Sequence, residues 1–319
     1  IHAFFLTEKY KNPVLEELAP ELNEAVEKPL PEKMELCGIT THDIFPFRDQ
    51  LGALPDTAAF YRSFLQQPPL FLRCRPGKKE TVVQKLQEHH IDFRVLDDDA
   101  LMLKNATKLD DIIQLNVEAV VQDYSSQQVL NYLRTYHAKE KISAWDACAA
   151  SGGKSILLFD ILKGNVKITV SDIRPSMLQN LAERLKDAGV NIYRKFAADL
   201  TRPNTQPGDE KFDIILCDVP CSGSGTWARS PEQLFFFSEN KLSGFAERQQ
   251  QIVNNTLPFL KENGLFFYIT CSVFKKENEE MAAWIADQFS LQLLEQKDIT
   301  GYGAGADTMF VGLFGKKAL

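Results

Sequence analysis

One stretch, WDACAASGGKSIL at residues 145–157, most constrains what this chain can fold into. It begins with the apolar end of a strand, passes through small residues, and resumes with helix formers. Small residues let a backbone approach a ligand closely, and glycines at a helix start leave amide donors exposed. The stretch therefore predicts a binding loop for a flat or anionic ligand. It is neither a Gly-x-Gly-x-x-Gly fingerprint nor a P-loop, which would need glycine at Cys148. A purely structural glycine turn is the alternative.

Strands and helices alternate after residue 142, which predicts an α/β fold with a doubly wound sheet. The predicted strands cover residues 142–146, 166–172, 191–197, 212–218, 265–270, 290–295 and 308–314. The predicted helices cover residues 154–163, 175–187, 243–261 and 277–289. Ligands of such sheets bind outside the carboxyl ends of the strands, so the residues that follow each strand are the candidate site.

Acidic residues and cysteines follow these predicted strands. Asp172 is placed to accept two ribose hydroxyls, and Asp199 could face an adenine amino group, although a strand-end aspartate can also be only a helix N-cap. Cys221 and Cys271 lie in polar loops, where nearby amide donors can lower a thiol pKa. Cys148, like Cys217, is expected to be a small apolar filler.

The chain divides into three predicted parts: a helical N-terminal cap at 1–66, a small α/β (βαββ) domain at 67–119, and the sheet domain at 120–319. In the cap, one helical face is predicted to carry Val14, Leu15, Leu18 and Leu22. Pro29 and Pro31 are predicted to end helices. The small domain carries four cations at one end that could meet phosphates, or form only a solvated turn: Arg73, Arg75, Lys78 and Lys79.

Composition narrows the class of protein. With 319 residues and a net charge of −7, the chain does not resemble a protein that coats nucleic acid indiscriminately. Its six cysteines include no Cys-x-x-Cys pair, so we expect neither a metal site nor a disulfide framework. No apolar run approaches a membrane span and no signal peptide is visible, so we expect a cytoplasmic protein without a membrane partner, and a monomer.

Three blocks of this sequence resemble the signature blocks of a known family: DACAASGGKS at 146–155, DVPCSGSGTWARSPE at 218–232 and YITCSVFKKENEE at 268–280. They are similar to those of the Sun/Fmu family of RNA 5-methylcytosine methyltransferases, which use S-adenosylmethionine. The segments VQDYSS at 121–126 and GADTMF at 305–310 are also similar, so the resemblance covers roughly residues 120–315. It implies a Rossmann-like methyltransferase sheet with helices on both faces.

The resemblance also implies residue roles. Cys271 would be the nucleophile, Cys221 would assist product release, Asp218 would touch both cofactor and base, and Lys154 would line the site. The implied cofactor-binding residues are Cys148, Ala149, Ala150, Ser151, Gly152, Gly153, Lys154, Asp172, Asp199 and Asp218. These roles make chemical sense, because cytosine C5 is a poor nucleophile until a thiolate adds to C6. A hydrogen bond to N3, for which Asp218 is the candidate, would help that addition.

Two positions depart from the family pattern. Ser151 replaces a customary proline, and Ala228 replaces the first of two customary arginines, with Arg229 as the second. RNA affinity would then rest on local basic patches: 73–79, 194–195, 229 and 275–276. The implied substrate is RNA, with ribosomal RNA first and transfer RNA next. A methyltransferase for another acceptor and a non-catalytic ribosome-assembly factor with the same fold are the other hypotheses.

Overall fold

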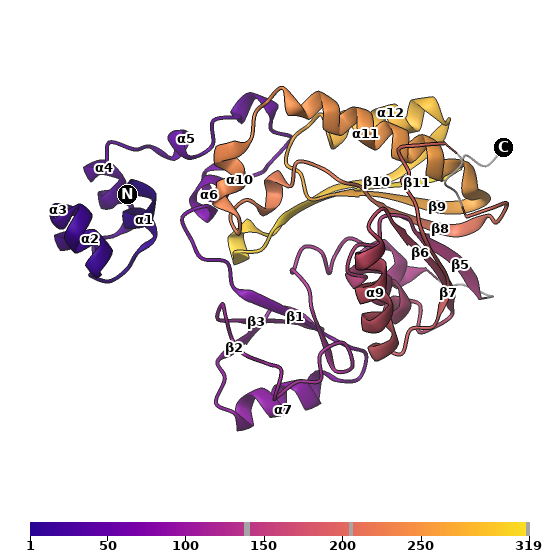
Figure 1. Ribbon diagram of the computed structural model, residues 1–319, viewed down its shortest axis with the longest axis horizontal. Helices are drawn as coiled ribbons and strands as arrows, with labels where there is room; N and C mark the ends of the chain where they lie inside the picture. Colours follow the sequence, from indigo (N-terminus) through magenta and orange to yellow (C-terminus); the bar gives the residue numbers. More distant parts are fainter. Residues whose placement is uncertain (137–140, 204–206, 317–319) are drawn as a thin grey trace.

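The computed structural model describes residues 1–136, 141–203 and 207–316. A mixed sheet of seven strands dominates the described chain, in the order β10-β11-β9-β8-β5-β6-β7 (Figure 1). Its strands are β5 (Ile142–Asp146), β6 (Val166–Asp172), β7 (Ile192–Ala197), β8 (Phe212–Asp218), β9 (Leu260–Thr270), β10 (Leu291–Thr300) and β11 (Thr308–Lys316). Strands β5 to β9 pair in parallel, whereas β11 runs antiparallel to both of its neighbours. The predicted α/β fold is confirmed.

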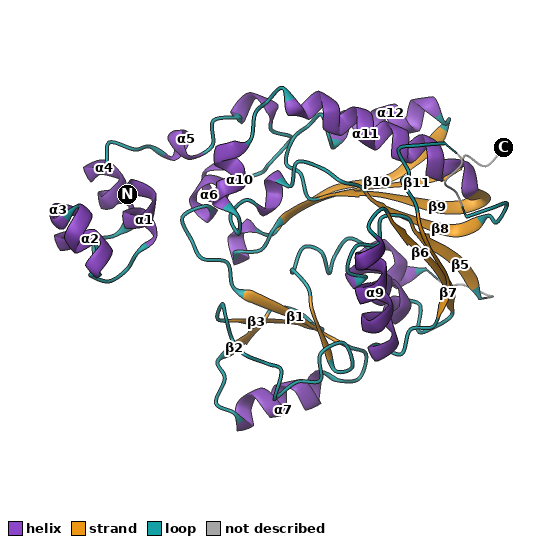
Figure 2. Ribbon diagram, in the orientation of Figure 1, coloured by secondary structure: helices purple, strands orange, loops and turns teal. Residues whose placement is uncertain are grey.

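Helices cover both faces of this sheet (Figure 2). One face packs against α8 (Gly153–Ile161) and α9 (Pro175–Asp187), and the other against α11 (Lys241–Thr256) and α12 (Glu279–Gln288). Between β8 and β9 the chain also forms η3 (Ser224–Thr226), α10 (Pro231–Phe236) and η4 (Leu257–Phe259), and η5 (Tyr302–Ala304) precedes β11. The predicted helix at 243–261 ends earlier, at Thr256, because Pro258 cannot continue it.

The small α/β unit forms a separate sheet of four antiparallel strands, in the order β2-β3-β1-β4. Its elements are β1 (Leu70–Cys74), α7 (Lys79–Glu88), β2 (Phe93–Val95), β3 (Ala100–Leu103) and β4 (Ala119–Val121), followed by η2 (Asn131–Thr135). The predicted βαββ order is present, and β4 adds an edge strand that the sequence pattern did not indicate. This unit has its own apolar core, built around Leu72, Val82, Leu86 and Leu101.

The N-terminal segment is helical, as predicted, but its faces differ from the prediction. It contains α1 (His2–Thr7), α2 (Pro13–Leu18), α3 (Pro20–Glu24), α4 (Leu30–Leu36), α5 (Thr41–Ile44), η1 (Arg48–Gln50) and α6 (Thr57–Ser63). Leu15 is buried, whereas Val14 is 49% and Leu18 65% exposed, because the helix breaks before Pro20 and no common face forms. Pro29 and Pro31 begin α4 instead of ending a helix, since proline fits the first helical turn.

An aromatic cluster joins the N-terminal segment to the sheet domain. Phe45, Phe60 and Phe64 pack with Trp227 and Phe274, which follow β8 and β9. The ring centroids of Phe45 and Trp227 are 6.1 Å apart, and those of Phe45 and Phe274 are 6.0 Å apart. Helices α1 to α4 form a smaller core of their own, set apart from the sheet domain in Figure 1. Among the described residues, no helix is both long and apolar enough to cross a bilayer.

Candidate functional site

The site lies where the strand order of the large sheet reverses. The chain runs from β5 to β7 on one side and from β8 to β9 on the other, so the carboxyl ends of β5 and β8 flank a crevice. The predicted binding loop follows β5 there. Ala150 and Gly152 adopt positive φ angles of 44° and 80°, and α8 begins at Gly153. The backbone amide of Ala150 donates to Asp172 Oδ2 at 3.0 Å, which fixes the loop against the end of β6.

Two adjoining cavities open at these strand ends. The first, of about 630 Å³, lies between the loops after β5, β6, β7 and β8. The predicted site residues that line it are Cys148, Ala150, Asp172, Asp199, Asp218, Cys221 and Cys271. The second, of about 310 Å³, lies on the side of the small domain. The predicted site residues that line it are Cys148, Ala149, Ala150, Ser151, Gly153, Lys154, Asp218 and Cys271. Gly152 lines neither cavity, but its positive φ angle shapes the backbone of the loop.

The aspartates of the first cavity are held by hydrogen bonds. Arg174 donates through Nε to Asp172 Oδ1 at 3.0 Å and through Nη2 to Oδ2 at 3.2 Å. Burial by itself would raise the pKa of Asp172, but these bonds and the Ala150 amide lower it below its usual value. Asp199 accepts from the hydroxyl of Thr201 at 2.6 Å, which lowers the pKa of Asp199. Both side chains therefore present carboxylates.

A lysine and two aspartates meet where the cavities join. Lys154 Nζ donates to Asp218 Oδ2 at 2.6 Å. Burial opposes the charge on Lys154, but Asp218 outweighs burial and raises the pKa of the ammonium. Asp146, at the end of β5, is buried and accepts from the hydroxyl of Ser155 at 2.6 Å. Burial raises the pKa of Asp146 to about 7, and its Oδ1 has no hydrogen-bond partner in the described chain.

The two loop cysteines lie side by side. Cys221 Sγ and Cys271 Sγ are 3.4 Å apart. The thiol–thiol contact and burial raise the pKa of Cys221 well above its usual value, so the lowered thiol pKa that the sequence predicted for this residue is wrong. Cys148 also differs from the prediction, because it is only half-buried and lines both cavities. Cys217 is a buried filler, as predicted.

A buried carboxylate connects the loops of the two cysteines. Glu277 Oε1 accepts from the Ser222 amide at 2.9 Å and from Gln249 Nε2 at 2.9 Å. Glu277 Oε2 accepts from the hydroxyl of Ser272 at 2.6 Å and from that of Ser222. Ser222 follows Cys221 and Ser272 follows Cys271, so the Glu277 side chain fixes both loops.

Close packing beside these loops also requires Gly225, since a Cβ there would lie 2.1 Å from the carbonyl oxygen of Thr308.

Two of the predicted phosphate-binding cations are used inside the protein. Arg73 and Arg75 are buried, and both pair with Asp160 of α8, at 2.6 Å and 2.8 Å. They attach the small domain to the sheet domain and are not open to phosphates, which corrects the prediction. Arg229 pairs with Asp307, with Nε 2.8 Å from Oδ1. Its charge is therefore also largely occupied.

The serine that replaces the customary proline has its own support. Arg184 Nη1 donates to the carbonyl oxygen of Ser151 and to its hydroxyl, both at 3.1 Å. The same guanidinium donates to Asn116 Oδ1 at 2.8 Å, so the binding loop is tied to the small domain. A side chain from α9 thus restrains the loop at the position where the backbone lacks a proline ring.

Sequence reasoning missed several side chains of the site. Asp146 and Glu277 lie within the sequence blocks that resemble the family's signature blocks. No role was predicted for them, because the sequence does not show that they are buried. Asp307 lies in the GADTMF segment, which was the available signal for it. Arg174 and Arg248, which line the first cavity, follow no pattern that the sequence alone displays.

Known proteins are similar to this chain in sequence and in fold. A family model described as "16S rRNA methyltransferase RsmB/F" matches residues 133–308. A "probable ribosomal RNA small subunit methyltransferase B" from Synechocystis sp. is 30% identical over 72% of this chain and 52% of its own length. A relative of the same description from Bacillus subtilis is 30% identical over 58% of this chain and 41% of its own length. The chain thus spans about half the length of the curated relatives it matches.

Solved structures agree in fold. A methyltransferase homolog from Pyrococcus horikoshii superimposes with a TM-score of 0.70 at 20% identity, covering 90% of this chain and 98% of the other. NSun6 from the same organism, solved with SFG, gives a TM-score of 0.70 at 13% identity over 86% of this chain and 96% of its own. The family model matches more than half of the chain and includes the binding loop and both cysteines. The chain therefore belongs to the RsmB/F family of 16S rRNA methyltransferases.

Proposed function

We propose that the protein methylates cytosine C5 in small-subunit ribosomal RNA, with S-adenosylmethionine as methyl donor. The observation that carries the proposal is the pair of thiols 3.4 Å apart, with Cys271 lining both cavities. Nitrogen and oxygen acceptors need no thiolate, whereas C5 of cytosine does. The names of the relatives support ribosomal RNA as the substrate class.

The residues of the first cavity fit the proposed cofactor. Asp146, which lines the adjoining second cavity, has an unpartnered buried oxygen where a cofactor ammonium would find an acceptor. Asp172 would exchange the guanidinium of Arg174 for the ribose hydroxyls, and Asp199 lies where the adenine amino group would bind. Backbone amides of the 148–153 loop would hold the methionine part. When bound, the cofactor supplies a methyl group on a positively charged sulfur.

The protein side chains divide the chemistry among them. The Cys271 thiolate forms a bond to C6, and the electron pair of the C5–C6 double bond moves towards C5. N3 accepts a hydrogen bond during this addition, and the proton comes from the Lys154–Asp218 pair, because a bare carboxylate cannot donate. C5 then forms a bond to the methyl carbon as the bond from that carbon to the donor sulfur breaks. A water molecule then takes the proton from C5, the electron pair of that C–H bond restores the C5–C6 double bond, and the Cys271 sulfur leaves C6 as a thiolate.

Cys221 assists the last step. Its raised pKa keeps the sulfur protonated near neutral pH, so Cys221 is not a second nucleophile. A thiol in this position can hydrogen-bond to the departing Cys271 sulfur, which it already contacts. The two cysteines therefore have different tasks, although they lie side by side.

The test is methyl transfer from labelled S-adenosylmethionine to RNA from cells that lack the protein, followed by nucleoside analysis. Label is expected in 5-methylcytidine and is expected to disappear with Cys271→Ala. Cys221→Ala is expected to accumulate a covalent RNA adduct on denaturing gels. Absence of that adduct would refute the division of labour between the cysteines, and cofactor binding without any RNA labelling would favour a non-catalytic factor.

A further inference from the structure

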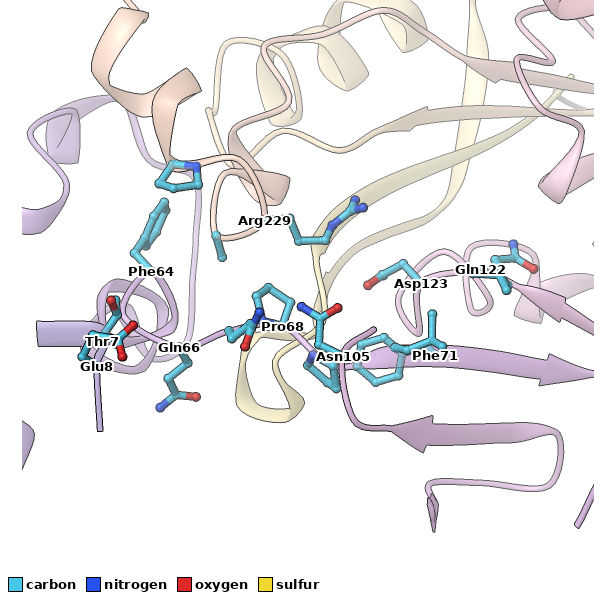
Figure 3. A pocket seen from close by; sticks show the side chains of 16 residues that line it. Thr7, Glu8, Phe64, Gln66, Pro68, Phe71, Asn105, Gln122, Asp123 and Arg229 are labelled. Atoms are coloured by element: carbon cyan, nitrogen blue, oxygen red, sulfur yellow. The ribbon is translucent and has the colours of Figure 1, made fainter. Parts of the chain in front are cut away.

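A third cavity, of about 630 Å³, continues the site outward from the cysteines. Figure 3 shows side chains that line it, contributed by four parts of the chain: Thr7 and Glu8 at the end of α1, Phe64 and Gln66 after α6, Phe71 and Asn105 of the small domain, and Arg229 after η3. It shares four lining residues with the second cavity: Val121, Gln122, Asp123 and Arg229. A strand of substrate that places one base beside Cys271 would therefore run into this third cavity.

The groups offered in this cavity are mainly uncharged. The side-chain amides of Gln66, Gln67 and Asn105 make no hydrogen bond within the described residues. The charges of Arg229 and Asp123 are already bound, to Asp307 and to backbone amides respectively. An amide presents a donor and an acceptor side by side, which matches the edge of a nucleobase better than a phosphate.

Two exposed aromatic side chains lie on α10, the helix whose first residue, Pro231, lines the same cavity. Phe235 and Phe236 of α10 are 82% and 68% exposed, with ring centroids 5.1 Å apart. Pro231 lines the cavity, and Phe235 follows it by one helical turn on the same face of α10. The neighbouring Leu234 and Phe237 pack into the aromatic cluster and anchor the helix. Exposed aromatic rings beside a substrate path are typical stacking platforms for unpaired bases.

We propose that the third cavity, together with Phe235 and Phe236 of α10, binds the unpaired nucleotides next to the target cytosine. The aromatic rings stack on a base and the amides of Gln66 and Asn105 contact its edge. This inference rests on the proposed function, because it assigns a subsite to the same RNA strand. It gives the protein a source of RNA affinity that does not depend on cations.

The test compares Phe235→Ala/Phe236→Ala with the control Tyr193→Ala, an aromatic residue that is 57% exposed on β7, outside all three cavities. The probe is a fluorescein-labelled ten-nucleotide RNA with one cytosine, bound at 50 mM KCl and followed by anisotropy. We expect the double variant to bind roughly five- to a hundredfold more weakly, the range for loss of one stacked base. Tyr193→Ala should bind like the unaltered protein. Both variants should keep its melting temperature, since the altered rings are exposed.

A second probe locates the contact. Replacing the nucleotides beside the cytosine by abasic sites should weaken binding to the unaltered protein and leave binding to the double variant unchanged. Equal RNA affinity of the double variant and the unaltered protein would overturn the inference and leave the proposed function standing. If the unaltered protein neither binds nor methylates RNA, both the inference and the proposed function fail.

Discussion

The buried Glu277 side chain accepts hydrogen bonds from both cysteine loops. Its carboxylate accepts from Ser222, Ser272 and Gln249, all of which donate. Glu277→Gln turns one acceptor oxygen into an NH₂ group that faces donors. We expect a loss of roughly 1–3 kcal/mol in the free energy of unfolding, the cost of unpaired buried groups. We also expect a fall in kcat larger than any rise in KM, because the cysteine loops move apart.

Urea unfolding and methyl-transfer kinetics measure these two effects. Glu280→Gln is the matched control, since Glu280 is exposed in the first turn of α12, just after Glu277, and should change neither quantity. A Glu277→Gln protein with normal kcat would show that the carboxylate does not position the loops. Gln has nearly the same shape as Glu but carries an NH₂ group in place of one carboxylate oxygen. If Glu277→Gln keeps normal stability and kcat, only the shape of the side chain matters. If both fall, the hydrogen bonds matter.

Asp146 makes stability depend on pH. Its pKa is raised to about 7 in the folded protein, whereas an unfolded aspartate titrates near its ordinary value. The folded chain therefore holds a proton that the unfolded chain releases. As a result, the free energy of unfolding falls as the pH rises towards 7. Between pH 5 and pH 8 we expect the wild-type protein to lose about 2–3 kcal/mol relative to Asp146→Asn, which cannot ionise.

Urea unfolding of both proteins at pH 5 and pH 8 measures this difference. Other titrating groups contribute equally to the two proteins and cancel in the comparison. If the difference in unfolding free energy between the two proteins stays constant from pH 5 to pH 8, Asp146 is already ionised in the folded state at pH 5.

The elements of the sheet domain were largely predictable, and their surroundings were not. Strands β5, β6 and β8 have the predicted bounds, since buried parallel strands are apolar runs that end at polar residues. The strand ends then brought Asp172, Asp218 and Cys271 together as the topology requires. Whether a charged side chain faces solvent or a neighbouring element depends on contacts distant in sequence. Arg73 and Arg75 were misjudged for that reason.

The contact between β1 and α8 is the element-scale feature that those arginines create. Asp160 accepts from both guanidinium groups, and all three side chains are largely buried. Asp160→Ala leaves two buried cations without their carboxylate, so we expect a loss of about 3–5 kcal/mol. The exposed pair of Lys104 and Asp92 supplies the control, because Asp92→Ala should cost at most about 1 kcal/mol.

Thermal unfolding and limited proteolysis of the two variants distinguish the outcomes. Asp160→Ala should lower the melting temperature and expose the junction near residue 119 to protease, while Asp92→Ala should do neither. Similar behaviour of the two variants would show that the buried pairs do not hold the small domain in place.

At the scale of the whole molecule, several cores combine to form the third cavity. The aromatic cluster brings α6 to the loops after β8 and β9, and the Asp160 pairs bring the small domain to α8. The third cavity exists only because both attachments are made. The sequence pattern indicated each unit separately, but pairs such as Phe45 with Phe274 are too far apart in the chain for periodicity to connect them.

Charge at this scale predicts how RNA binding responds to salt. The net charge is −7, and Arg73, Arg75 and Arg229 are engaged by carboxylates. These three cations are therefore not available to replace the counterions of RNA, and we expect neutral contacts at the proposed subsite to carry much of the affinity. For about three to four phosphate contacts on a single strand, the slope of log K against log salt should be about −2 to −3. Anisotropy titrations between 50 and 300 mM KCl measure this slope. A slope steeper than about −6 would mean that a larger basic surface binds the RNA backbone.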